Sequence, residues 1–292
     1  MSKKILVIYH ASCADGFGAC MAAYKKFGDT ADYHPGFYNE TPPDCEDKHV
    51  FLLDFSYKKD VIINMLLDAK SVTILDHHKS AIEDLVDLFE KPYFFTMQGM
   101  LASYKTATLE GVLDAGRSGA MIAWDYFHED FKSQHPELIK YIQDRDLWKF
   151  ELEGSKEVAL AIFSYPYDFG TWEGLFEMPI EDLIDEGRAL LRKHEKDIAE
   201  FLKVGTRRIN IGGYNIPVVN MPYFYGSDAC NILAAGEPFS AYYWDGATHR
   251  NWGLRSAPDG VDVAKIAADG FNGGGHKHAA GFKTDLNWCG DA

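Results

Sequence analysis

Acidic residues and histidines recur in this sequence directly after short apolar segments, and side chains of these two types together can bind metal ions. The set comprises His10, Asp15, Asp54, the run Asp76-His77-His78, Asp144 and Asp146. Carboxylate oxygens combined with imidazole nitrogens favour Mn²⁺, with Mg²⁺, Fe²⁺ and Zn²⁺ as alternatives. Any one of these residues alone is more commonly a helix cap or a solvated loop residue. The prediction of a metal site therefore depends on whether the set meets at one place.

The elements expected around these residues predict that they do meet. Apolar runs predict buried strands and small-residue or amphipathic runs predict helices, in the order strand 4–9, helix 16–23, strand 50–53, helix 59–69 and strand 72–75. This alternation predicts an N-terminal α/β domain with a doubly wound, mainly parallel sheet. Ligands of such sheets bind beyond the carboxyl ends of the strands, where the acidic residues and histidines would gather.

The sequence pattern in the second half of the chain predicts a different architecture. Residues 116–163 are expected to be mostly helical, with Pro136 opening a helix that ends near Asp144. Residues 180–204 have a long amphipathic pattern, which fits a connecting helix and fits an ordinary surface helix equally well. After it, strands are expected at 207–211, 215–220, 239–244 and 249–255, with a hairpin turn at Gly212-Gly213.

Length and composition agree with a globular protein of two domains. At 292 residues the chain can bury two modest cores, and we expect a first domain over 1–180, a linker helix over 181–205 and a smaller mixed α/β domain over 206–292. The formal net charge of −15 argues against binding to long duplex DNA, which needs many Lys and Arg contacts. Neither a signal peptide nor a membrane span is expected, and five scattered cysteines without a CxxC pair agree with the cytoplasm.

Five segments resemble the motifs of a known superfamily. Four segments resemble the four motifs of the DHH phosphoesterase superfamily, in order and spacing: YHASCADGFGA, LLDFSY, TILDHHKSA and YIQDRDLW. A fifth segment resembles the DHH-associated C-terminal domain: NWGLRSAPDGVDVAKIAADGFNGGGHKHAAGF. The resemblance spans nearly the whole chain. It implies an oligoribonuclease-like or exopolyphosphatase-like phosphohydrolase that uses two metal ions.

The resemblance also implies which residues bind the metals. Asp54 would bridge the two ions, with Asp15, His77 and Asp144 completing one site and His10 helping to form the other. Two ions about 3.5–4 Å apart lower the pKa of a bridging water and hold the phosphoryl group, so that the metal-activated hydroxide attacks phosphorus. The catalytic residues implied are Asp54, His77 and His78.

Several roles stay open. Asp76 would orient the ligands without binding a metal itself, and His78 would contact the substrate phosphate or make a structural hydrogen bond. In the fourth motif Asp144 is preferred over Asp146, although spacing alone does not separate them. The first motif carries Cys13 where the family usually has aspartate. This cysteine is either a soft metal ligand, which would weaken that site or favour zinc or iron, or a small packing residue.

The C-terminal motif implies a phosphate-binding site. The run Gly273-Gly274-Gly275 can bring backbone N–H groups close to an anion, and His276 would add a donor at the start of a following helix. Arg255 suits bidentate recognition of phosphate. In the first domain, Ser118 and Gly119 at an expected helix start are either a second anion contact or a helix cap, and the cap is preferred.

These features together predict hydrolysis of phosphodiester bonds in short oligonucleotides or linear dinucleotides, releasing mononucleotides. The negative net charge agrees, because a long polyanion would be repelled. Hydrolysis of polyphosphate or pyrophosphate is the alternative, and an aromatic shelf for a nucleobase would distinguish the two. Candidates for the shelf are Phe224, Tyr225, Trp252 and Phe271. A third alternative is a catalytically inactive nucleotide-binding sensor that lost activity through the change at Cys13. The oligomeric state stays open, with a homodimer as one alternative.

Overall fold

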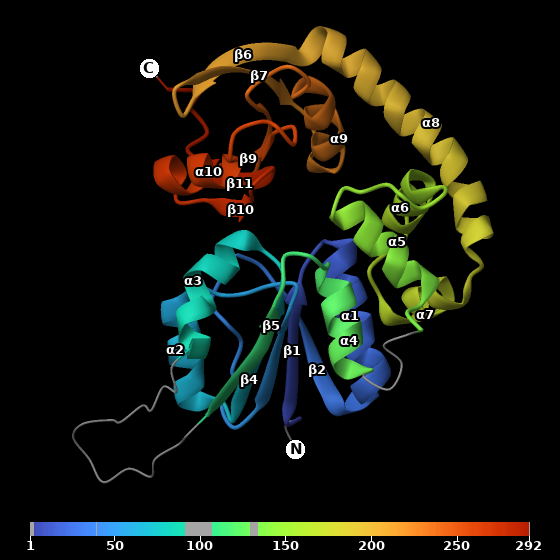
Figure 1. Cartoon of the computed structure of the whole chain (residues 1–292), viewed down its shortest axis with the longest axis vertical. Coiled ribbons are helices and arrows are strands. Elements are labelled where there is room, and N and C mark those ends of the chain that lie inside the picture. The colour runs from blue at the N-terminus through green and yellow to red at the C-terminus, as the bar shows by residue number, and fades with distance from the viewer. Residues whose placement is uncertain (1–2, 39, 91–106, 129–133, 292) are drawn as a thin grey trace. The chain divides into compact units, whose positions relative to one another are not determined.

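The chain forms two compact units, Met1–Leu190 and Leu191–Ala292 (Figure 1). The computed structural model describes residues 3–38, 40–90, 107–128 and 134–291. The boundary between the units lies inside the long helix α8 (Ile180–Gly205), expected from the sequence as a connecting helix. Leu183 packs into the core of the first unit and Ile198 into a core of the second. The two ends of α8 therefore stabilise different units. None of the helices in the described ranges combines the length and apolar character needed to cross a membrane.

A parallel sheet organises the first unit. Its strand order is β2-β1-β3-β4-β5, with all neighbours parallel. The strands are β1 (Ile5–His10), β2 (Ala31–Gly36), β3 (His49–Leu53), β4 (Ser71–Asp76) and β5 (Thr108–Leu113). The order changes direction between β1 and β3, so the carboxyl ends of these two strands form the switch point at which doubly wound sheets bind ligands. The doubly wound fold predicted from the sequence is confirmed.

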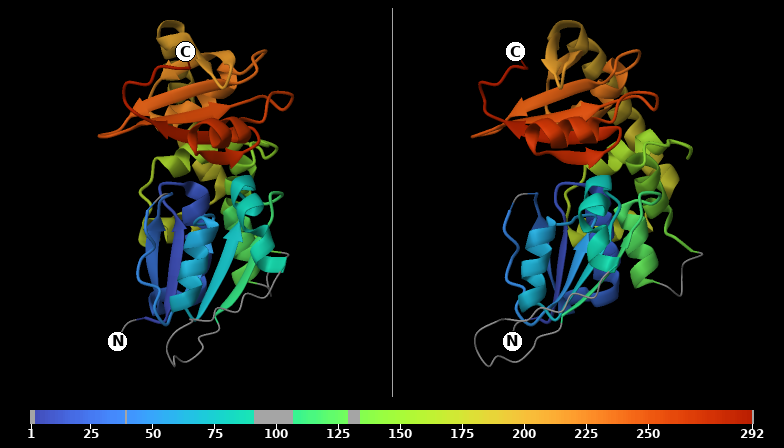
Figure 2. Two further views of the ribbon diagram at one scale, coloured as in Figure 1. Left: turned by 90° about the vertical axis from the view of Figure 1, so that its left-hand side faces the viewer. Right: turned by 60° about the vertical axis from the view of Figure 1, so that its left-hand side comes forward.

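Helices cover both faces of this sheet, as Figures 1 and 2 show. One face carries α2 (Lys59–Asp68) and α3 (Lys79–Glu90), and the other carries α1 (Ala14–Phe27) and α4 (Gly119–Phe127). Because side chains alternate along a strand, β1 contributes to both cores. Leu6 and Ile8 pack into the core on the α2 side, whereas Val7 packs into the core on the α1 side. This double burial explains why the inner strands read as continuous apolar runs.

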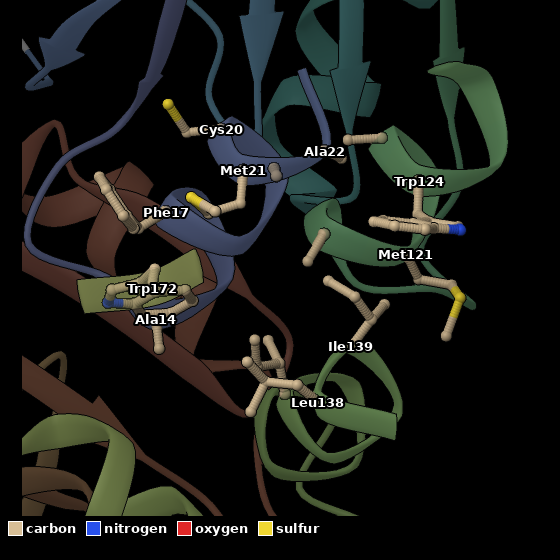
Figure 3. Packing of buried hydrophobic residues seen from close by; sticks show 14 of the residues in the cluster. Ala14, Phe17, Cys20, Met21, Ala22, Met121, Trp124, Leu138, Ile139 and Trp172 are labelled. Atoms are coloured by element: carbon tan, nitrogen blue, oxygen red, sulfur yellow. The ribbon is translucent and has the colours of Figure 1, made fainter. Parts of the chain in front are cut away.

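The larger core joins α1 and α4 to the helices that follow them. These are α5 (Glu137–Asp146), α6 (Ser155–Phe163) and α7 (Phe169–Glu177). Figure 3 shows Phe17 of α1 beside Trp172 of α7, and their ring centroids lie 5.0 Å apart in an edge-to-face arrangement. Gly18 allows α1 to approach closely, because a Cβ atom there would lie 3.1 Å from the side chains of Ala120 and Ile142. The missing side chain at Gly18 thereby lets α4 and α5 pack closely against α1.

The second unit contains a mixed sheet in the order β10-β11-β9-β8-β7-β6. Its elements are β6 (Thr206–Ile211), β7 (Tyr214–Asn220), α9 (Tyr223–Leu233), β8 (Ser240–Asp245), β9 (Arg250–Arg255), α10 (Val263–Phe271), β10 (Gly274–His276) and β11 (Ala279–Thr284). β7 and β8 are parallel and the other neighbours antiparallel. Val218 packs on the face covered by α10, and Val219 on the face covered by α9. The predicted mixed α/β architecture is confirmed.

One expected element is wrong. His276 does not begin a helix, because Gly274–His276 form β10, which pairs with β11 in antiparallel register. The helix of this region, α10, precedes the glycines and ends at Asn272 in a left-handed conformation. The glycine run therefore connects a helix to an edge strand.

Candidate active site

Asp54 lies at the centre of the site, directly after β3. Its side chain is almost fully buried, and its backbone N–H donates to the Leu75 carbonyl at 2.8 Å. The backbone φ of Asp54 is 53°, a left-handed conformation that is unfavourable for a residue with a side chain. Such local strain costs on the order of 1–3 kcal/mol and concentrates at functional sites. The surrounding fold therefore holds Asp54 in a backbone conformation that this residue would not favour by itself.

Two groups of residues that could each hold a metal ion share Asp54. The first consists of Asp15, Asp54 and His77, and the second of His10, Asp54 and His78. Within each group the potential ligand atoms lie within 4.8 Å of one another. His77 Nε2 lies 3.0 Å from Asp54 Oδ1, and His10 Nδ1 lies 3.3 Å from Asp54 Oδ2. The two oxygens of one carboxylate thus face different histidines.

Asp15 is held in place by the N-terminus of α4. The Gly119 N–H donates to Asp15 Oδ2 at 2.6 Å and the Ala120 N–H donates to Oδ1 at 3.0 Å. Ser118 caps the same helix, since its hydroxyl accepts from the Met121 N–H at 3.3 Å. Free N–H groups at a helix start are suited to binding an anion. The segment is both a cap and an anion contact, and the anion is a carboxylate of the chain itself.

Asp76 organises the histidine pair that follows it. This fully buried carboxylate accepts from the backbone N–H groups of His77 at 2.7 Å and His78 at 3.1 Å. Asp76 Oδ1 also lies 2.8 Å from His78 Nδ1, and the Ser56 hydroxyl donates to Oδ2 at 2.5 Å. A carboxylate that holds one ring nitrogen fixes the tautomer and leaves the other nitrogen for a ligand. The geometry therefore agrees with a role for Asp76 in orienting the ring of His78.

The structure brings Asp146, and not Asp144, to this cluster. Asp146 Oδ2 lies 3.6 Å from His77 Nε2. The Asp144 carboxylate accepts instead from the backbone N–H groups of Glu151 at 3.0 Å and Leu152 at 3.2 Å. Two residues apart on α5, the side chains point about 200° apart around the helix. The Asp144 carboxylate thus holds the loop after α5, and Asp146 is the one that faces the histidine, so the geometry favours Asp146 over the predicted Asp144 as a candidate ligand.

Several buried carboxylates lie close together in this site and shift the pKa values of their neighbours. Burial raises the pKa of Asp15 well above its usual value, and the negative charges of Asp54 and Asp146 raise it further. Burial alone would lower the pKa of His77, but contact with Asp54 and the charges of Asp146 and Asp15 outweigh it and raise that pKa to about 11. The contacts with His10 and His77 likewise outweigh burial at Asp54 and hold its pKa well below the usual range. The cluster therefore attracts positive charge.

One buried atom tests whether a cation fits the cluster. Asp54 Oδ1 is buried, and the described residues give it no hydrogen bond of acceptable geometry, although His77 Nε2 is near. Its contacts are the ion pairs with His77 and His78, so this carboxylate oxygen can still accept a further ligand. A metal ion ligated by Asp54 would satisfy this atom, and the mixed oxygen and nitrogen donors around it suit Mn²⁺ and related ions.

Cys13 lies close to these carboxylates but belongs to neither metal-binding group. It is the residue before α1, and its thiol is half-buried. Burial raises the pKa of the thiol well above its usual value, and the charges of Asp54, Asp15 and Asp146 raise it further. A protonated thiol is a weak ligand, because metal binding requires the thiolate. Because a bound metal ion would itself favour the thiolate, both alternatives for Cys13 stay predictions.

The residues expected to bind phosphate all lie in the second unit. The Arg255 guanidinium donates to the Ser227 hydroxyl at 2.6 Å and to the Leu254 carbonyl at 2.8 Å. The Gly273 N–H donates to the Ala267 carbonyl at 2.9 Å, so one amide of the expected cradle is already used.

Close packing accounts for two of the three glycines. A Cβ atom at Gly273 would lie 2.2 Å from the Gly281 carbonyl oxygen, and one at Gly275 would lie 2.5 Å from that of Ala279. Gly274 and His276 lie on β10, at the open edge of the sheet. Edge strands carry backbone groups that no neighbouring strand uses.

The aromatic candidates divide into buried and exposed residues. Trp252 is buried and Phe271 packs against the same core, so neither forms a shelf. Phe224 is exposed, whereas Tyr225 is half-buried and donates to the Asp197 carboxylate at 3.0 Å. Sequence reasoning missed Tyr38, whose ring contacts His10 and His78 in the first unit. The available signal in the sequence was the aromatic pair Phe37-Tyr38 directly after Gly36.

Comparisons with known proteins find relatives of low sequence identity. No protein-family model matches the chain. It is 28% identical over 302 aligned residues to uncharacterized protein R106 of Acanthamoeba polyphaga mimivirus, covering 95% of this chain but 66% of that protein. The chain thus spans slightly less than two thirds of its curated relative.

Several solved structures resemble the chain over most of its length. An exopolyphosphatase-related protein from Bacteroides fragilis has a TM-score of 0.49 at 12% identity, covering 98% of this chain and 88% of that one. RecJ from Thermus thermophilus in complex with Mn²⁺ has a TM-score of 0.47 at 14% identity, covering 96% and 49%. The pGpG-specific phosphodiesterase PggH from Vibrio cholerae has a TM-score of 0.45 at 14% identity, covering 97% and 94%. At these scores the likenesses carry no argument about activity.

Proposed function

We propose that this protein is a phosphoesterase that binds two divalent metal ions, with Mn²⁺ preferred, and hydrolyses phosphodiester bonds of short oligonucleotides or linear dinucleotides to mononucleotides. The observation that carries the proposal is the sharing of Asp54 by two potential metal-binding groups in the first unit. This arrangement agrees with the motif resemblance of the sequence, which implies a bridging carboxylate at the same position.

Each group would hold one ion through residues from different elements. Asp15, His77 and Asp146 would complete one site around Asp54, and His10 and His78 the other. Bound divalent cations would supply the positive charge that lowers the pKa of water and neutralises a phosphate oxygen. The protein's own part is to hold the ligands rigidly, through the α4 N-terminus at Asp15 and through Asp76 at His78.

The substrate phosphate would be bound by the C-terminal unit. We propose a metal-binding domain over 1–180 and a substrate-binding domain over 206–292, joined by the helix over 181–205. Arg255 is the main candidate, since Ser227 and Leu254 hold its guanidinium in a fixed orientation. A prepositioned planar fork of donors suits a terminal phosphate. Gly274 and His276 on the edge strand are further candidates.

Turnover of a labelled dinucleotide tests the proposal. Protein stripped of metal and then given Mn²⁺ should release mononucleotides, and the isosteric variant Asp54→Asn should lose at least about 100-fold in rate, because it removes the charge shared by both ions. Polyphosphate is assayed in parallel, to distinguish a polyphosphatase. If the wild-type protein cleaves no dinucleotide with Mn²⁺, Mg²⁺, Fe²⁺ or Zn²⁺, the proposal fails. Binding without turnover, together with activity gained by Cys13→Asp, would indicate a sensor instead.

A further inference from the structure

Two aromatic residues stand exposed immediately after β2. Phe37 is 44% exposed and Tyr38 is 45% exposed, directly beyond Gly36 at the carboxyl end of the strand. β2 pairs with β1 in parallel register, with Gly36 opposite His10. The segment therefore begins beside the strand end that carries a predicted metal ligand. Neighbouring exposed aromatic side chains are costly in water and are typical of binding sites.

Tyr38 is fixed against the histidines of the site. Its ring centroid lies 5.3 Å from that of His10 and 6.2 Å from that of His78, both in edge-to-face arrangements. Beneath it lies Phe55, fully buried, with ring centroids 5.0 Å apart. Three neighbours thus hold the ring, while nearly half of the residue's surface stays open to solvent.

A glycine permits this close packing. A Cβ atom at Gly36 would lie 2.9 Å from the Ile8 side chain and 3.1 Å from the Phe55 ring. The chain therefore passes directly over Phe55 before it reaches Tyr38. A rigid, supported and partly exposed ring is suited to stacking, because little conformational entropy is lost when a second ring is placed on it.

We propose that Tyr38 forms the stacking shelf for a nucleobase of the substrate beside the His10–His78 pair. The inference rests on the proposed phosphoesterase function and deepens it, because a shelf at this place selects nucleotides over polyphosphate, which has no base to stack. It also places the shelf in the first unit, whereas the aromatic candidates expected from the sequence lie in the second unit. Stacking on an aromatic side chain is tolerant of base identity, so every base is accepted and a base-free substrate is disfavoured.

The alternative role for Tyr38 is a hydrogen bond from its hydroxyl to a phosphate oxygen. Tyr38→Phe keeps the ring and removes the hydroxyl, whereas Tyr38→Ala removes both. A shelf requires only the ring, so the phenylalanine variant should rescue what the alanine variant loses. A hydroxyl donor predicts that both variants fail alike, and that the loss is the same for substrates with and without bases.

The test compares kcat/KM for a dinucleotide and for its analogue in which both bases are replaced by hydrogen. In wild-type protein the dinucleotide should be preferred, and Tyr38→Ala should reduce this preference between about 5-fold and 100-fold, mainly through KM. Tyr38→Phe should keep it. Leu67→Ala, a variant of a similarly exposed residue on α2, should match the wild-type ratio. Mn²⁺ affinity measured on the same variants should not change, whereas a purely structural role would weaken it.

The outcomes separate this inference from the proposed function. If wild-type protein hydrolyses the dinucleotide and Tyr38→Ala leaves the preference for bases intact, the shelf is refuted and the phosphoesterase stands. Equal losses in Tyr38→Ala and Tyr38→Phe would also refute it, in favour of the hydroxyl. If the wild-type protein cleaves neither substrate, the proposed function itself fails.

Discussion

Gly119 and Asp54 approach each other so closely that no side chain fits between them. A Cβ atom built on Gly119 would lie 2.4 Å from the Asp54 Cβ atom and 2.7 Å from its Oδ1 atom. The same glycine donates its backbone N–H to Asp15 at 2.6 Å. One residue at the start of α4 therefore contacts two carboxylates, Asp15 in the first turn of α1 and Asp54 at the end of β3.

Replacing Gly119 by alanine should disrupt the metal site more than the fold. The added methyl group must displace Asp54, so Gly119→Ala is expected to lower Mn²⁺ affinity by about 10- to 100-fold, as loss of supporting contacts around a metal commonly does. Isothermal titration with Mn²⁺ measures the effect. Gly174→Ala is the matched control, since no atom lies within 4 Å of a Cβ atom there. Equal Mn²⁺ affinity in both variants would show that the close approach has no functional consequence.

The two aspartates of the fourth motif should separate in a pair of isosteric variants. Asp146→Asn is expected to weaken Mn²⁺ binding with little change in the free energy of unfolding. Asp144→Asn should keep Mn²⁺ binding but destabilise the first unit by about 1–3 kcal/mol, because its buried carboxylate accepts two backbone N–H groups. Urea unfolding and metal titration together check this. The reverse pattern would restore Asp144 as the ligand.

Metal affinity should rise with pH. In the metal-free protein the pKa of His77 is raised to about 11, so its Nε2 atom, which faces Asp54, carries a proton at neutral pH. A metal ion that binds this nitrogen must displace the proton, so binding releases protons and is favoured as pH rises. Calorimetric titrations with Mn²⁺ at pH 6.5 and 8.0 measure the affinity at each pH. Repeating them in buffers of different ionisation enthalpy measures the number of protons released. An affinity independent of pH would argue against ligation by His77.

Bound metal should stabilise the first unit against heat. A cation that binds only the folded state adds to the free energy of unfolding. At a free Mn²⁺ concentration 100 times the dissociation constant, the gain is about 2.7 kcal/mol per site. Differential scanning calorimetry after removal of metal with EDTA checks this. Asp54→Asn should show no such gain, and a gain as large as in wild type would place the ions elsewhere.

The inner strands of the first sheet could be predicted from the sequence, but its edges could not. β1, β3 and β4 are buried on both faces and therefore read as apolar runs. β2 includes Pro35 and polar residues and has few buried side chains, and no residue of β5 is fully buried. Both lie at the edges of the sheet, where proline and polar residues are tolerated because one side has no neighbouring strand. Their pairing depends on tertiary contacts that no local pattern reveals.

The meeting of the candidate ligands could be predicted because it follows from topology. His10 ends β1, and Asp54 and His77 follow β3 and β4, parallel strands whose carboxyl ends share one edge of the sheet. The choice between Asp144 and Asp146 could not be predicted, because it depends on where α5 ends and which way it is rotated. The expected end near Asp144 was two residues short of the observed end. The rotation of α5 decides which carboxylate faces the histidine.

Electron paramagnetic resonance of the Mn²⁺-loaded protein tests the central claim most directly. If Asp54 joins two ions, the protein should bind two Mn²⁺ per chain and give the multiline spectrum of a spin-coupled pair, and Asp54→Asn should abolish that coupling. A single ion per chain, or two ions without coupling in the wild-type protein, would contradict the account.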